Sequence, residues 1–131
     1  MKFSARIQNK SGDHQTRLSV GDKEQSLTIA PKSGGGSSVT GGELLFLALA
    51  TCYCNDIYRE AAGQNIKVNG VEVEVEGDFE APGRPASNVV YRAKVDADAT
   101  EEQIRELMLH TDAVAEIQNT LRVGTPVRLE L

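Results

Sequence analysis

"TGGELLFLALATCYCNDIYREAAG", residues 40–63, is the stretch that predicts a long buried helix. Thr40 and Glu43 have the spacing of a capping box: the Thr40 hydroxyl accepts a hydrogen bond from the Glu43 amide, and the Glu43 carboxylate accepts one from the Thr40 amide. The helix is expected to run from about Gly41 to Ala62. Gly63 suits the position just beyond a helix end.

The first three turns of this helix carry no polar stripe. Their apolar residues are Leu44, Leu45, Phe46, Leu47, Ala48, Leu49, Ala50, Cys52 and Tyr53. A helix that is apolar on all sides must be covered on all sides, and a small domain with one sheet covers only one of them. A second copy of the chain is the simplest cover, so the sequence predicts a homodimer.

The segments before the helix read as short strands. Residues 2–8 place Phe3, Ala5 and Ile7 on one face, residues 14–20 follow a turn, and residues 26–30 point Leu27 and Ile29 inward. Three antiparallel strands are expected. The Gly- and Ser-rich residues 31–42 form a loop, which lacks the lysine of a phosphate-binding loop.

The segments after the helix predict a hairpin, a second helix and a last strand. Residues 67–79 alternate valine with glutamate, and residues 88–98 return with Arg92 and Lys94 opposite those glutamates. Thr100 caps a helix that reaches about residue 121, with a break near residues 110–112, and residues 125–131 form a terminal strand. The fold class is therefore α+β, in one domain spanning residues 1–131.

Composition excludes several classes of function. The 131 residues carry a net charge of −5, which argues against binding nucleic acid. The longest apolar run, Leu44 to Ala50, is far shorter than the roughly 18 residues that cross a bilayer. Without a secretory signal or a disulfide framework, the chain is expected in the cytoplasm with reduced thiols. No cofactor is predicted.

The two cysteines, Cys52 and Cys54, are separated by one residue. On a helix they point roughly 200° apart, so they cannot share a pocket or form an unstrained disulfide. A zinc site would need further ligands, and the chain has only His14 and His110, at no recognised spacing. At most one cysteine is the working thiol. The alternative is that both are small packing residues.

The run Glu43, Leu44, Leu45, Ala48, Leu49 and Cys52 resembles the central helix of the OsmC/Ohr superfamily, the osmotically induced and organic hydroperoxide resistance proteins. The predicted strand order matches over nearly the whole chain. The resemblance implies an intertwined homodimer and a reactive cysteine that reduces organic hydroperoxides. Cys52 matches that cysteine, Glu43 is the candidate acid, and Arg17, preferred to Arg6, is the candidate activating arginine.

The sequence departs from the family pattern at two positions, so it resembles the broader OsmC-like branch rather than the hydroperoxide reductases proper. Asp112 stands where the second, resolving cysteine is expected, and Gly42 stands where the reductases place the acid. The resemblance then implies a one-cysteine thiol peroxidase that needs an external thiol reductant. The alternative is a non-catalytic homodimer that binds a small apolar molecule at its interface, with both cysteines structural.

Helix geometry constrains any partnership between Glu43 and Cys52. Nine residues along a helix correspond to roughly 13.5 Å and opposite faces. Glu43 would therefore serve a cysteine of the partner subunit, by orienting an arginine, because an acid alone raises a thiol pKa. The other interpretation is that Glu43 only caps the helix.

Overall fold

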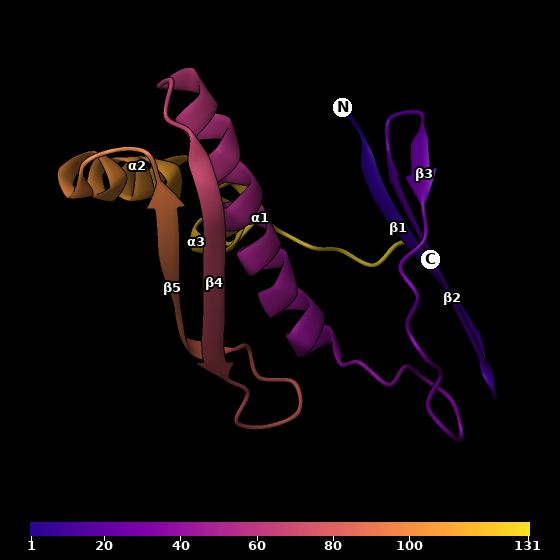
Figure 1. Cartoon of the computed structure of the whole chain (residues 1–131). Helices are drawn as coiled ribbons and strands as arrows, with labels where there is room; N and C mark the ends of the chain where they lie inside the picture. The colour runs from indigo at the N-terminus through magenta and orange to yellow at the C-terminus, as the bar shows by residue number, and fades with distance from the viewer. The chain divides into compact units, whose positions relative to one another are not determined.

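The computed structural model describes residues 1–131 and confirms the α+β class (Figure 1). Its elements are β1 (Phe3–Lys10), β2 (Asp13–Val20), β3 (Lys23–Gln25), α1 (Gly41–Gly63), β4 (Val68–Asp78), β5 (Ser87–Ala97), α2 (Glu101–Val114) and α3 (Glu116–Arg122). The chain divides into two compact units, an N-terminal unit (Met1–Leu44) and a C-terminal unit (Leu45–Leu131).

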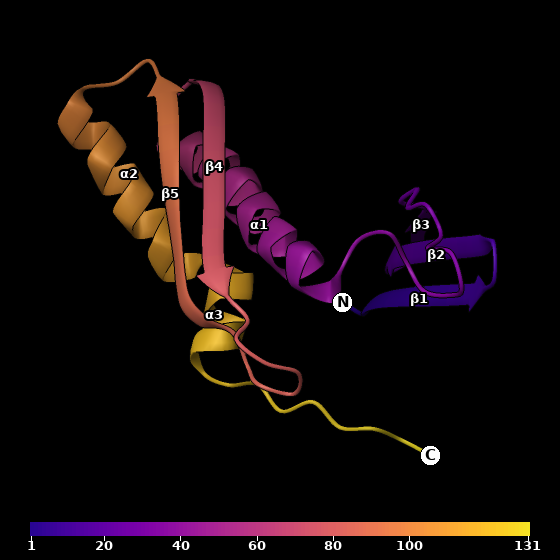
Figure 2. The same cartoon turned by 90° about the horizontal axis from the view of Figure 1, so that it is seen from below.

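The N-terminal unit is an antiparallel meander in the order β1-β2-β3 (Figure 2). The first two strands match their predicted positions, and the third lies earlier than predicted, at Lys23–Gln25 rather than residues 26–30. Gly21, with φ of 56°, allows a tight turn that pairs Val20 with Lys23 at once. Farther on, the Thr16 hydroxyl accepts the Leu27 N–H at 3.0 Å, so a side chain replaces the backbone ladder there.

The face that Phe3, Ala5 and Ile7 share is not buried within this unit, and the prediction that Leu27 points inward is wrong, because Leu27 is 43% exposed. Every residue of β1 is exposed, with Phe3 at 68% and Ile7 at 58%. Three strands form one layer, and an apolar sheet face is buried only when a second layer packs on it. Within the N-terminal unit no helix or second sheet supplies that layer.

Helix α1 has the predicted bounds and the predicted cap. The Glu43 amide donates to the Thr40 hydroxyl at 3.1 Å, and the Thr40 amide donates to the Glu43 carboxylate at 3.1 Å. This capping box satisfies two of the amides that a helix start leaves without partners. Despite the apolar first half of α1, no helix of the protein is long and apolar enough to cross a membrane.

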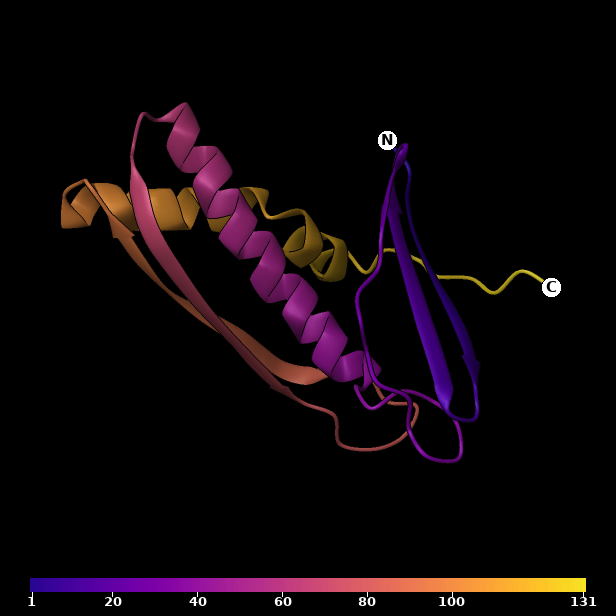
Figure 3. The same cartoon turned by 45° about the vertical axis from the view of Figure 1, so that its right-hand side comes forward.

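The C-terminal unit packs α1 and α2 on one face of the β4–β5 hairpin (Figure 3). The predicted register is confirmed, with Glu72 opposite Lys94 and Glu74 opposite Arg92 on the outer face. The inner face belongs to the core. Its buried residues are Tyr53, Ile57, Ala61 and Leu107, and Ile66, Val68, Val71, Val73, Tyr91, Ala93, Val95 and Met108 pack against them.

The predicted second helix is two helices, and the break lies at Ala115 rather than near residues 110–112. The Thr111 hydroxyl donates to the Leu107 carbonyl at 2.7 Å, within an unbroken turn of α2. Ala115 takes an extended conformation and is fully buried. The chain bends where this small residue packs inside, and α3 starts immediately afterwards.

The predicted strand at residues 125–131 is absent. The segment has no regular structure, and Val127 and Leu129 are 97% and 84% exposed. Figure 2 shows it leaving α3 without joining the hairpin. A strand needs a sheet edge to pair with, and this segment pairs with neither edge of the β4–β5 hairpin.

Candidate functional site

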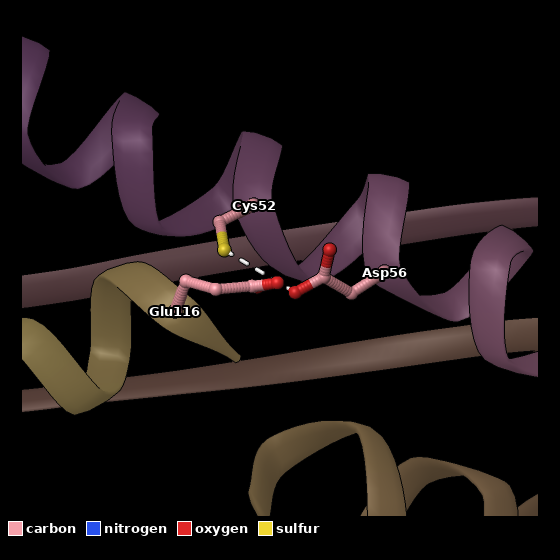
Figure 4. A group of neighbouring side chains, drawn as sticks. All are labelled: Cys52, Asp56 and Glu116. Atoms are coloured by element: carbon pink, nitrogen blue, oxygen red, sulfur yellow. Dashed lines mark hydrogen bonds between the residues drawn. The ribbon is translucent and has the colours of Figure 1, made fainter. Parts of the chain in front are cut away.

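Cys52 lies half-buried on α1, and its thiol donates a hydrogen bond to Asp56 (Figure 4). The distance between Cys52 Sγ and Asp56 Oδ2 is 3.4 Å. Residues four apart on a helix lie on the same face one turn apart, so this contact follows from the local sequence. Asp56 is only 6% exposed, which is rare for a carboxyl group and requires polar partners.

The first partner is Glu116, which reaches the pair from the first turn of α3 (Figure 4). Ligand-type atoms of Cys52, Asp56 and Glu116 all lie within 4.8 Å of one another. Sulfur and two carboxyl groups thus meet where α1 contacts α3.

Arg59 is the second partner and binds both carboxyl groups. Its Nη1 lies 3.1 Å from Asp56 Oδ1 and 2.5 Å from Glu116 Oε1. Its Nε donates to Glu60 at 2.8 Å, and Glu60 also contacts His110 of α2 at 2.7 Å. Cys52, Asp56, Arg59 and Glu60 recur at offsets of four, seven and eight, which places them along one helix face.

The surroundings favour a neutral thiol at Cys52. Burial is the main cause that raises the pKa of Cys52, and the charges of Asp56 and Glu116 raise it further. The backbone N–H of Ile117 lowers it in part. A thiolate here needs an additional cation or a nearby group that accepts its proton.

The two carboxyl groups differ in how readily they hold a proton. Burial, followed by the neighbouring carboxyl group of Glu116, raises the pKa of Asp56. The hydrogen bond from Arg59 is the main cause that lowers the pKa of Glu116. Of the two groups, Asp56, which contacts the sulfur, therefore accepts a proton more readily than Glu116.

The same three residues are of types that can bind a divalent metal, but we assign no metal site here, because their carboxylates already pair with Arg59. One sulfur and carboxylate oxygens within 4.8 Å of one another are an acceptable partial set. Arg59 competes for the same oxygens, because its guanidinium already binds both carboxylates. The sequence prediction of no metal site considered cysteine and histidine ligands but not carboxylates, and it did not foresee this cluster.

Cys54 and Asp112 do not belong to the cluster. Cys54 is half-buried and has a free thiol, two residues along α1 from Cys52. Asp112 accepts hydrogen bonds from the Tyr91 hydroxyl and from Arg122 Nη2, the latter at 2.7 Å. The position where a resolving cysteine was expected therefore joins β5, α2 and α3.

The other predicted site residues lie in the N-terminal unit. Glu43 is engaged in the capping box, and Arg17 forms an exposed ion pair with Glu24 at 3.1 Å. Arg6 stands directly opposite Arg17 in the β1–β2 register. Both arginines line a hollow of about 270 Å³ in this unit. Two like charges placed directly opposite each other on paired strands destabilise the pairing.

Sequence reasoning missed Asp56, Arg59 and Glu116. The spacing Cys-x3-Asp-x2-Arg was visible in residues 52–59, and it places all three side chains on one face of the predicted helix. Glu116 offered no comparable signal. It reaches Arg59 across 57 positions of sequence, and only the bend at Ala115 brings α3 to α1.

Comparison with known protein families identifies the chain. Residues 34–130 match the family model described as OsmC-like protein, and the chain belongs to this family. The resemblance predicted from the α1 motif is thereby confirmed. No curated protein matches the chain.

Solved structures show the same fold at low sequence identity. An OsmC-like protein of unknown function from Vibrio cholerae is 19% identical, with 92% of this chain and 93% of that chain covered and a TM-score of 0.64. An OsmC-like protein from Mycoplasma pneumoniae is 16% identical, with 93% and 89% covered and a TM-score of 0.63. An organic hydroperoxide resistance protein from Legionella pneumophila is 18% identical, with 93% and 90% covered and a TM-score of 0.61.

Proposed function

We propose that this protein reduces organic hydroperoxides with the thiol of Cys52. The observation that carries the proposal is the placement of Cys52 on the central helix of an OsmC-like chain, hydrogen-bonded to a buried carboxyl group. Similar structures include organic hydroperoxide resistance proteins, which supports hydroperoxides as the substrate class.

The reaction has two balanced steps. Cys52 attacks one peroxide oxygen, the O–O bond breaks, and the products are Cys52 sulfenic acid and an alcohol. Two equivalents of an external thiol then restore the Cys52 thiol and yield a disulfide and water. Because Asp112 holds the position of a resolving cysteine, the second step depends on a free thiol of the kind that a reducing cytoplasm supplies.

Arg17 and Glu43 complete the proposed site through a homodimer. Exposed apolar residues favour a second copy of the chain as partner. They lie on the uncovered face of β1, at Leu47 of α1, and at Val127 and Leu129. The C-terminal unit places no cation directly at the Cys52 sulfur. In the dimer, an arginine from the hollow lined by Arg6 and Arg17 would supply that cation. Glu43 would orient that arginine.

The test is peroxide consumption with cumene hydroperoxide and a dithiol reductant. The wild type is compared with Cys52→Ser and with the matched control Cys54→Ser. The proposal predicts that Cys52→Ser abolishes turnover and that Cys54→Ser retains it. Wild-type turnover no faster than that of Cys52→Ser would refute the enzyme and leave a binding role for the fold.

The same preparations test the partners. Light scattering at micromolar concentration should give the mass of a dimer, and a monomeric mass would contradict the interface. Arg17→Gln should slow peroxide consumption more than Arg6→Gln. Equal activity of Arg17→Gln and the wild type would remove Arg17 from the site.

A further inference from the structure

The contact between Cys52 and Asp56 bears on how protons move during peroxide reduction. A thiol that attacks a peroxide must lose a proton, and the leaving alkoxide must gain one. The acceptor of the Cys52 S–H is Asp56 Oδ2 at 3.4 Å, on the same helix face. A single group at that position is able to serve both transfers.

We propose that Asp56 takes the proton of the Cys52 thiol and returns it to the leaving oxygen of the peroxide, held in position by Arg59 and Glu116. This inference rests on the proposed function. Asp56 touches the reacting sulfur and is the catalytic residue. Arg59 and Glu116 act through it, because Arg59 Nη1 contacts Asp56 Oδ1 at 3.1 Å and also binds Glu116 Oε1.

Each step balances in atoms and charge. First the proton passes from Cys52 to the Asp56 carboxylate, which gives a thiolate and a neutral carboxylic acid. The thiolate then attacks the peroxide oxygen, the S–O bond forms, and the O–O bond breaks. The alkoxide takes the proton from Asp56 and leaves as the alcohol. Cys52 ends as sulfenic acid, and Asp56 returns to its ionised form.

The surroundings of Asp56 favour its protonated form after the transfer. The charged and titratable groups that face Asp56 are Cys52 and Arg59 from α1 and Glu116 from α3. Burial and Glu116 raise the pKa of Asp56, so a proton received there is retained longer than on an exposed aspartate. Arg59 keeps the cluster from accumulating uncompensated negative charge.

The mechanism fixes a pH signature. The reactive form carries one proton shared by Cys52 and Asp56, so the wild-type rate should stay level between the two pKa values. Asp56→Asn cannot accept the proton. Its rate should follow the thiolate alone and rise about tenfold per pH unit up to the pKa of Cys52.

The decisive experiment compares two oxidants in a Cys54→Ser background. tert-Butyl hydroperoxide releases an alkoxide that is at least as basic as hydroxide and that needs a proton to leave as the alcohol. Peracetic acid releases acetate, whose conjugate acid has a pKa of about 4, as for a carboxyl side chain, and which leaves without a proton. Iodoacetamide alkylation measures the thiolate population independently. Asp96→Asn, an exposed aspartate on β5, is the matched control.

Asp56→Asn should slow the reaction with tert-butyl hydroperoxide by about 100-fold relative to alkylation. It should leave the reaction with peracetic acid within a few-fold of the wild type, and Asp96→Asn should change neither. Equal losses with both oxidants would show a misplaced sulfur and overturn the role of Asp56, as would a level pH profile in Asp56→Asn. A wild type that is alkylated but inert to both oxidants would instead refute the proposed function itself.

Discussion

Replacement of Glu116 by glutamine tests whether the α3 carboxylate suppresses the thiolate of Cys52. Glutamine keeps the shape of the side chain and an oxygen that accepts from Arg59, so the contact between α1 and α3 is preserved. Only the negative charge is lost. Because that charge raises the pKa of Cys52, its removal must lower the pKa.

The magnitude follows from the separation. The Glu116 side chain is 57% exposed, so the dielectric constant of water applies. At 4.8 Å the repulsion between a thiolate and Glu116 is then about 0.9 kcal/mol. This corresponds to a fall of about 0.6 in the pKa of Cys52, and to about four times more thiolate at neutral pH.

The assay is the pH dependence of iodoacetamide alkylation in a Cys54→Ser background, which leaves Cys52 as the sole thiol. Glu106→Gln, an exposed glutamate of α2, is the matched control and should leave the pKa unchanged. A pKa of Cys52 that rises or stays constant in Glu116→Gln would refute the electrostatic reasoning about the cluster.

Three further predictions concern the fold and the assembly. Ile57→Ala removes three buried carbons, each worth about 0.8 kcal/mol, and leaves a cavity. In urea unfolding it should lower the free energy of unfolding by about 3 kcal/mol, against about 1 kcal/mol for Ile57→Val. Equal losses in the two variants would contradict the packing around Ile57. Gly77→Ala would place a methyl group 2.8 Å from the Phe46 ring. This overpacking should cost about 1–3 kcal/mol of stability and lower the melting temperature. An unchanged melting temperature would show that the ring moves freely. Truncation after Gly124 removes the exposed residues Val127 and Leu129 and should shift the mass measured by light scattering from dimer to monomer. A dimer that survives truncation would exclude the tail from the interface.

Local signals allowed much of the fold to be predicted. The capping box of Thr40 and Glu43 depends on residues three apart, and the valine–glutamate alternation of β4 defines a two-faced strand without reference to distant residues. These features were predicted correctly. The short third strand was misplaced because the Gly21 turn and the Thr16 side chain decide where pairing begins and ends.

The misses share a different cause, which is dependence on a partner segment. Phe3 and Ile7 have the pattern of a buried strand face, and Val127 and Leu129 have the pattern of a strand, yet neither pattern specifies what covers it. The residues of the candidate site likewise fall into those with a local sequence signal and those without one. Cys52 was found from its helix motif, whereas Glu116 joins it only through the packing of α3 on α1.

The most direct test of Cys52 as the reacting thiol is the intact mass of the protein after one equivalent of tert-butyl hydroperoxide, with dimedone present to trap sulfenic acid. The prediction is a single dimedone adduct in the wild type and in Cys54→Ser, located at Cys52 by peptide mapping, and no adduct in Cys52→Ser. An unmodified wild type, or an adduct that persists in Cys52→Ser, would contradict it.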